Sequence, residues 1–149
     1  MKKNKLLLVG TFPTEKTMDK LCKGYEVWGV SPCLFMGSIK SYLDKVFEIH
    51  RRDEYEQDTI GEISKTSLPV VMTKKDKRVK NVEIYPFNRI CKKYNCYFTN
   101  SISLMLVYAI ELGYKDIKIV GIEMESYREA IIERANLEYY IGLFRGQGN

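Results

Sequence analysis

The feature that most constrains the fold is a series of short apolar runs that alternate with longer stretches of helical pattern. Residues 6–10 form the first run and residues 116–121 the last, and each ends at a glycine. Short runs without polar alternation are typical of strands buried on both faces of a parallel sheet. Further strands are predicted at residues 25–29, 46–50, 68–72 and 82–85.

Helical patterns separate several of these strands. A short helix is predicted at residues 15–23, stopped by Gly24, and another at 86–94 with Pro86 in its first turn. Residues 101–112 carry apolar side chains at helical spacing, and residues 126–144 form a long last helix. This alternation predicts an α/β, Rossmann-like three-layer domain with a mostly parallel sheet of about five to six strands.

Length and composition favour a single domain over residues 1–149, since 45% hydrophobic and 29% charged residues are an ordinary globular balance. The apolar run near the N-terminus is too short for a signal peptide, and no stretch approaches the roughly 20 apolar residues that span a bilayer. We therefore predict a cytoplasmic protein with no membrane association and reduced thiols, in the host cytoplasm if it is phage-encoded.

The metal-ligating residue types do not favour a metal site. The four cysteines have no Cys-x-x-Cys spacing, and His50 is the single histidine. The net charge of +5 includes a basic run at residues 74–80. A solvated loop is the favoured interpretation of that run, because no aromatic residues are interleaved with it. Nucleic-acid binding stays open as an alternative.

Candidate ligand-binding residues follow the predicted strands, because parallel α/β sheets bind ligands beyond the carboxyl ends of their strands. The turn at residues 10–14 has neither the Gly-x-Gly-x-x-Gly fingerprint nor the lysine of a Walker loop. Its hydroxyls could meet a phosphate or a ribose, or it could be a plain strand-to-helix turn. The candidates at these strand ends are Gly10, Thr11, Pro13, Thr14, Gly29, Ser31 and Gly121.

A second group of candidates starts the helix at residue 101. Thr99, Asn100 and Ser101 offer small polar side chains where the free N–H groups and the positive end of the helix dipole favour a phosphate. The alternative is that Thr99 or Asn100 is only an N-cap.

The candidate catalytic residues are His50, Glu48 and Glu123. His50 follows Glu48 by two positions, so on a strand both side chains lie on one face and could form an acid–base pair. Glu123 and Glu125 follow the last predicted strand and could bind ribose hydroxyls, a metal or solvent.

The motifs resemble, in order along nearly the whole chain, those of a family of largely uncharacterised phage and prophage proteins. The matching segments are a turn after the first strand, Glu-x-Trp-Gly, Phe-Glu-x-His, a polar helix start, and a late Glu-Tyr followed by Gly. They lie at residues 10–14, 26–29, 47–50, 99–101 and 138–142. The resemblance implies a phage-type protein without indicating a reaction.

Residues 98–123 resemble the nucleotide-binding stretch of bacterial sialyltransferases that use CMP-sialic acid, and the related pterin pyrophosphokinase-like domains. In those transferases a turn after the first strand and a Thr-Ser-Gly helix start hold the nucleotide, which implies binding at residues 10–14 and 100–102. Thr11, Phe12 and Ile102 depart from those motifs, and the chain ends before the region that binds the acceptor. The departures imply that a nucleotide site survives where glycosyl transfer does not.

The leading hypothesis is a protein that binds a nucleotide or nucleotide-sugar, without a further cofactor, and that acts as a glycosyl or nucleotidyl transferase. His50 or Glu123 would be the base and Glu48 would orient His50. The alternative is a non-catalytic phage protein that sequesters a nucleotide signal or binds a host protein. Apolar residues on the last helix also suggest a homodimer.

Overall fold

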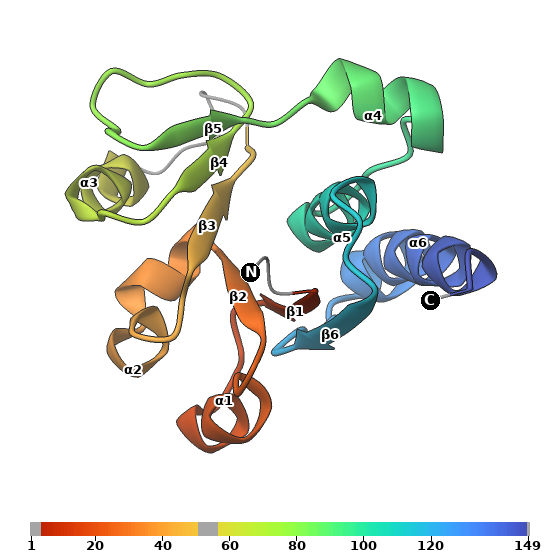
Figure 1. The fold of residues 1–149 in the computed structure, drawn as a ribbon, viewed down its shortest axis with the longest axis horizontal. Coiled ribbons are helices and arrows are strands. Elements are labelled where there is room, and N and C mark those ends of the chain that lie inside the picture. The colour runs from red at the N-terminus through yellow and green to blue at the C-terminus, as the bar shows by residue number, and fades with distance from the viewer. Residues whose placement is uncertain (1–3, 51–56, 149) are drawn as a thin grey trace.

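Six parallel strands form one sheet in the computed structural model, which describes residues 4–50 and 57–148 (Figure 1). The order across the sheet is β5-β4-β3-β2-β1-β6. This arrangement confirms the predicted Rossmann-like α/β fold. The strands are β1 Lys5–Val9, β2 Glu26–Val30, β3 Lys45–Glu48, β4 Val70–Met72, β5 Val82–Ile84 and β6 Asp116–Val120.

Helices cover both faces of the sheet and give the three predicted layers (Figure 1). On one face lie α1 (Glu15–Leu21), α2 (Gly37–Lys40) and α3 (Gln57–Lys65), and on the other lie α4 (Phe87–Tyr94), α5 (Ser101–Glu111) and α6 (Arg134–Gly146). A 3-10 helix, Ser31–Phe35, follows β2, and a π-helical segment, Glu129–Glu133, precedes α6.

The core lies between these layers and is centred on β1, whose four apolar residues are fully buried. In the sheet, Leu8 is flanked by Trp28 of β2 and Ile119 of β6. The Trp28 ring is 5.1 Å from that of Phe47 and 5.9 Å from that of Tyr108 on α5. Burying each large apolar side chain stabilises the fold by about 1.5–3 kcal/mol. The residues beyond these strands are therefore held on a rigid base.

The sheet has one topological switch point. From β1 the chain adds β2, β3, β4 and β5 successively on one side, and then returns through α4 and α5 to place β6 on the other side of β1. The connections leaving β1 and β6 consequently diverge to opposite faces, which opens a crevice at the carboxyl ends of these two strands.

Three local predictions need correction. The third strand ends at Glu48, so His50 lies just beyond it. The predicted last helix at residues 126–144 is present, but its part Glu129–Glu133 is π-helical and leads into α6, which ends at Gly146. The expectation of reduced thiols fails for Cys91 and Cys96, which form a disulfide at the end of α4, whereas Cys22 and Cys33 are free.

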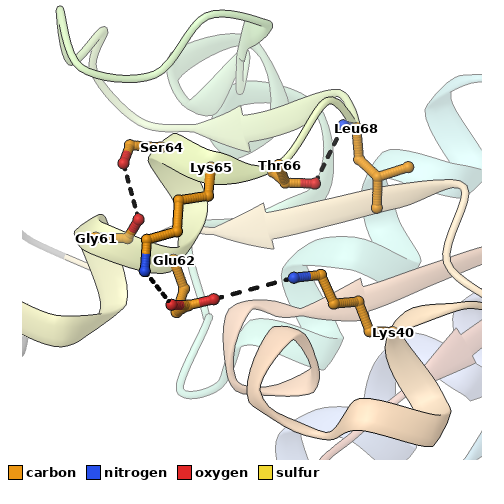
Figure 2. Close-up of polar contacts among 7 residues, drawn as sticks. All are labelled: Lys40, Gly61, Glu62, Ser64, Lys65, Thr66 and Leu68. Atoms are coloured by element: carbon orange, nitrogen blue, oxygen red, sulfur yellow. Dashed lines mark hydrogen bonds and ion pairs between the residues drawn. The ribbon is translucent and has the colours of Figure 1, made fainter.

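The sequence pattern did not predict α2 or α3, which cover the sheet beside β2 and β3. Glu62 of α3 binds Lys65 at 2.7 Å on its own helix and Lys40 of α2 at 3.9 Å (Figure 2). The lysines lower the pKa of Glu62, with the hydrogen bond from Lys65 as the largest cause. This surface cluster joins the two helices.

Candidate functional site

A cavity of about 350 Å³ lies at the carboxyl ends of β1, β2, β3 and β6, which is the edge of the sheet where its switch point falls. The start of α5 and the π-helical segment complete its walls. Its lining consists of Gly10, Thr11, Val30, Pro32, His50, Thr99, Asn100, Ser101, Ile102, Gly121, Ile122, Glu123, Met124, Glu129 and Glu133.

Two glycines form the floor where β1 and β6 end. The Gly10 N–H donates to Val120 O at 2.9 Å, and a Cβ atom at Gly10 would lie 2.4 Å from Gly121 O. Gly121 has a φ of +69°, and a Cβ there would lie 2.6 Å from Pro13 N. Both positions therefore need glycine for the strand ends to approach this closely.

The N-terminus of α5 opens into the cavity. Asn100 is the N-cap, and its Oδ1 accepts the Ser103 N–H at 2.8 Å. The N–H groups of the first turn, including those of Ser101 and Ile102, have no partner within the helix. Thr99 Oγ1 is a buried hydroxyl with no hydrogen-bond partner among the described residues. Together these groups offer an anion several donors at the positive end of the helix dipole.

Asn136 of α6 fixes the position of this helix start. Its side chain is completely buried, its amide donates to Tyr97 O, and its Oδ1 accepts the Thr99 N–H at 3.4 Å. The Asn100 amide in turn donates to Glu133 O at 3.1 Å. The α5 N-terminus is thus tied to the π-helical segment on the facing wall.

A hydrogen-bonded row, Ser31–Glu48–His50, forms the β2–β3 side of the cavity. The Glu48 side chain is 1% exposed, and its two oxygens accept the Ser31 hydroxyl and the His50 Nδ1–H, the latter at 2.6 Å. The backbone N–H of His50 also donates to Glu48, at 3.3 Å. Because an ionised carboxylate only accepts, Nδ1 carries the proton in neutral His50 and Nε2 is the basic nitrogen. The His50 side chain, 51% exposed, lines the cavity.

Three carboxylates, Glu123, Glu129 and Glu133, form the opposite wall. Glu129 and Ser126 make a capping box in which the Ser126 N–H donates to Glu129 at 3.0 Å and the Glu129 N–H donates to Ser126 Oγ at 3.2 Å. Hydrogen bonds from Ser126 lower the pKa of Glu129, whereas burial and the nearby Glu129 charge raise the pKa of Glu133. No Lys or Arg among residues 4–50 and 57–148 lines the cavity.

The structure brings most of the predicted site residues together. Those in the lining are Gly10, Thr11, His50, Thr99, Asn100, Ser101, Gly121 and Glu123. The other predicted residues lie behind it or beside it. Ser31 and Glu48 hold His50, Pro13 packs against Gly121, and Thr14 caps α1 by accepting the Thr17 N–H at 3.2 Å. A Cβ at Gly29 would meet Leu43 at 2.7 Å, so Gly29 serves packing.

Sequence reasoning missed Glu129 and Glu133. Neither residue follows a predicted strand, and the π-helical geometry that places both on the cavity wall has no simple sequence pattern. The Ser-x-x-Glu spacing of Ser126 and Glu129 is a known helix-start signal and could have located the beginning of this wall.

The basic run at residues 74–80 shows an internal structural role. The buried Asp76 accepts the Arg78 N–H at 2.9 Å and pairs with the Arg78 guanidinium at 2.7 Å. Part of the positive charge of the run therefore stabilises its own turn.

In the described part of the chain no cluster of three or more His, Cys, Asp or Glu could hold a metal ion, and no helix is long and apolar enough to cross a membrane. Comparisons of the chain with protein-family models, with curated proteins and with solved structures found no significant match. The function must therefore be argued from the cavity itself.

Proposed function

We propose that the chain binds a nucleotide or nucleotide-sugar in the cavity at the switch point. The observation that carries this proposal is that the N-terminus of α5 opens into a cavity lying where the connections from β1 and β6 diverge. In parallel α/β sheets this is the place where phosphate-containing ligands bind.

The chemistry of the walls suits the parts of such a ligand. A phosphate would lie against the first N–H groups of α5 and the hydroxyls of Thr99 and Ser101. Sugar hydroxyls would donate to the carboxylates of Glu123 and Glu129 on the opposite wall. A volume of about 350 Å³ lies near the lower end of the usual range for ligand sites, which favours a mononucleotide over a dinucleotide.

The two segments that resemble the sialyltransferase nucleotide site meet in this cavity. Gly10 and Thr11 come from the turn after β1, and Asn100, Ser101 and Ile102 come from the start of α5. Their convergence supports the proposal of a transferase-like nucleotide site.

A second candidate function is a non-catalytic protein that sequesters a nucleotide and binds a protein, either a host protein or a second copy. Exposed apolar side chains near the cavity favour it. Phe12 follows Thr11 of the cavity wall and is 57% exposed, and Ile131 belongs to the π-helical segment and is 53% exposed. Tight nucleotide binding without any product would identify this function.

Thermal unfolding against nucleotides, nucleotide-sugars, cyclic dinucleotides and NAD tests the proposal. A ligand at about 100 times its Kd adds about 2.7 kcal/mol, which raises the Tm by several degrees. We expect a shift with mononucleotides or nucleotide-sugars that His50→Ala and Ser101→Ala reduce. The control Ser41→Ala, at the end of α2, keeps the shift. No shift with any ligand would contradict the proposal.

A further inference from the structure

The two edge strands of the sheet differ in how readily they could pair with another strand (Figure 1). At one edge β5 has only three residues, and Pro86 follows it two positions later. Short edge strands and prolines discourage pairing with another chain. At the other edge β6 has five residues of intermediate burial, and among the described residues no strand lies beyond it. The edge that can accept a further strand is therefore β6.

The backbone groups of β6 that point away from β1 belong to Ile117 and Ile119. The Gly10 N–H donates to Val120 O at 2.9 Å, so the backbone of Val120 faces β1. Successive residues of a strand direct their N–H and C=O groups to opposite edges. Lys118 therefore also faces β1, whereas Ile117 and Ile119 present their N–H and C=O groups at the outer edge, where such groups are a template for a further strand.

A groove of about 400 Å³ runs between β6 and the helices α5 and α6. Ile117 and Ile119 share one face of β6, because side chains two residues apart point to the same side of a strand. Both line the groove, which is formed by Leu106, Lys115, Asp116, Ile117, Ile119, Ile141, Phe144 and Arg145. A strand added to β6 would therefore gain apolar burial as well as hydrogen bonds.

We infer that β6 pairs antiparallel with β6 of a second copy of this chain, about a two-fold axis at Ile117, so that the two sheets become one. In this register the two Ile117 residues lie opposite each other and exchange backbone hydrogen bonds. Asp116 of each copy lies opposite Lys118 of the other. The inference concerns an interface between copies and is independent of nucleotide binding.

Charge complementarity identifies a second copy as the occupant of this edge. A two-fold interface brings the same surface together twice, so the strand must complement itself. Asp116 and Lys118 flank Ile117 on one face of β6, and pairing about Ile117 forms two opposite-charge pairs. Pairing about Lys118 would instead place the two lysines opposite each other, which is destabilising. The charges therefore also determine the register.

Tyr25 of the neighbouring segment holds both charged side chains beside the edge. The Tyr25 hydroxyl donates to Asp116 Oδ2 at 2.7 Å, and Lys118 Nζ lies 4.3 Å from the centre of the Tyr25 ring. Lys5 Nζ lies 3.5 Å from the same carboxylate oxygen, and the Asp116 side chain is still 42% exposed. Restrained side chains lose less conformational entropy when they form a pair across an interface.

Sedimentation equilibrium of the full chain tests for the dimer. We expect a mass that approaches twice that of one chain as the protein concentration rises. Lys118→Asp and Asp116→Lys each turn the two opposite-charge pairs into like-charge pairs, and each should raise the dimer Kd by at least about tenfold. The matched control Lys75→Asp reverses an exposed charge in the basic run and should leave the Kd unchanged.

Mixing the two variants tests the register itself. The Lys118→Asp chain carries two negative side chains at this edge and the Asp116→Lys chain carries two positive ones. An equimolar mixture should therefore form a heterodimer although each variant alone is weakened, and the double variant Asp116→Lys/Lys118→Asp should form a homodimer again. A dimer that neither reversal weakens would lie on another surface and would overturn the inference, as would failure of both the mixture and the double variant to associate.

Amide hydrogen exchange provides a second readout on the unaltered protein. We expect the Ile117 amide to be protected at high protein concentration and to exchange faster on dilution, because its partner is in the other copy. The Lys118 amide, which faces β1, should stay protected at both concentrations. Exchange of Ile117 that does not depend on concentration, or a chain that stays monomeric throughout, would overturn the inference and leave the proposed nucleotide site untouched.

Discussion

The two ends of the strands carry hollows of opposite character. At the amino end a hollow of about 680 Å³ is lined by Glu26, Lys45, Glu83 and Tyr114, among others, and is larger than the cavity of about 350 Å³ at the carboxyl end. In the larger hollow the polar groups satisfy one another. Lys45 binds Glu83 at 2.7 Å, and Glu26 accepts hydrogen bonds from Trp28 at 2.7 Å and Tyr114 at 2.6 Å.

At the carboxyl end the polar groups are held in place but directed at the cavity. Glu48 and Asn136 are buried and fully engaged, and they position His50 and the start of α5, which line the space. The volume of a cavity alone therefore does not identify a ligand-binding site. What identifies it is a buried set of hydrogen bonds supporting groups that still have chemistry to offer a ligand.

The largest effect on the cavity at the carboxyl end is expected for Gly10→Ala. The new Cβ would lie 2.4 Å from Gly121 O and 2.8 Å from Ile122 Cγ1, so the ends of β1 and β6 must separate. We expect a loss of about 3 kcal/mol in the free energy of unfolding, measured with urea, together with loss of nucleotide binding. The control Gly61→Ala, where a Cβ meets nothing within 4 Å, should gain about 0.5–1 kcal/mol.

Glu26→Ala tests the amino end. It removes the acceptor of the Trp28 and Tyr114 hydrogen bonds, and we expect it to cost about 2 kcal/mol in urea unfolding. Calorimetric titration should find nucleotide affinity unchanged, because the hollow at this end binds no ligand in our account. A large loss of affinity would mean that the two ends have been assigned wrongly.

Two helix N-caps, one outside the cavity and one at its wall, allow a matched test. Thr14 caps α1 and Asn100 caps α5, so replacing either by Ala should cost about 1 kcal/mol of stability. Asn100→Ala should also weaken nucleotide binding, because α5 opens into the cavity, whereas Thr14→Ala should not. Equal affinities of the two variants in titration calorimetry would argue against a phosphate at α5.

The smallest effect is expected from Glu133→Gln. Burial and the Glu129 charge raise the pKa of Glu133 in the folded protein, so its ionisation opposes folding. This destabilisation is absent well below pH 4.5, the usual pKa of the carboxyl group. It develops as the pH rises from there and is complete above the pKa of Glu133 in the folded protein. At pH 7 Glu133→Gln should therefore raise the free energy of unfolding by less than about 0.5 kcal/mol and raise the Tm slightly. At low pH the Tm should be unchanged. A lower Tm at pH 7 would contradict this assignment.

Much of the fold could be predicted because its strands are short apolar runs buried on both faces. The pattern placed β1 and β6 to within a residue. The two strands differ in burial, because the apolar residues of β1 are fully buried inside the sheet, whereas β6 is an edge strand of intermediate burial. It did not reveal α2, which has only one buried residue, Ile39, nor the π-helical segment. These elements depend on tertiary contacts rather than on local periodicity.

For the site, sequence reasoning found residues that directly follow strands or begin α5, because the position of a strand end places its neighbours. It also predicted the pairing of Glu48 with His50, which the structure shows. It did not show that Ser31 would hold Glu48, which depends on how β2 and β3 align. It also could not predict that Glu133 lines the cavity, because the π-helical geometry of Glu129–Glu133 determines which of its side chains face the cavity.

The most direct test of the central claim is to map cytidine 5′-monophosphate onto the ¹⁵N-labelled protein by amide chemical shifts, with inorganic phosphate as a parallel titration. We predict saturable changes concentrated at residues 10–11, 30–32, 99–102 and 121–124, with phosphate alone affecting chiefly the start of α5. Changes confined to the hollow around Glu26 and Tyr114 or to the basic run at residues 74–80, or no changes at all, would contradict the account.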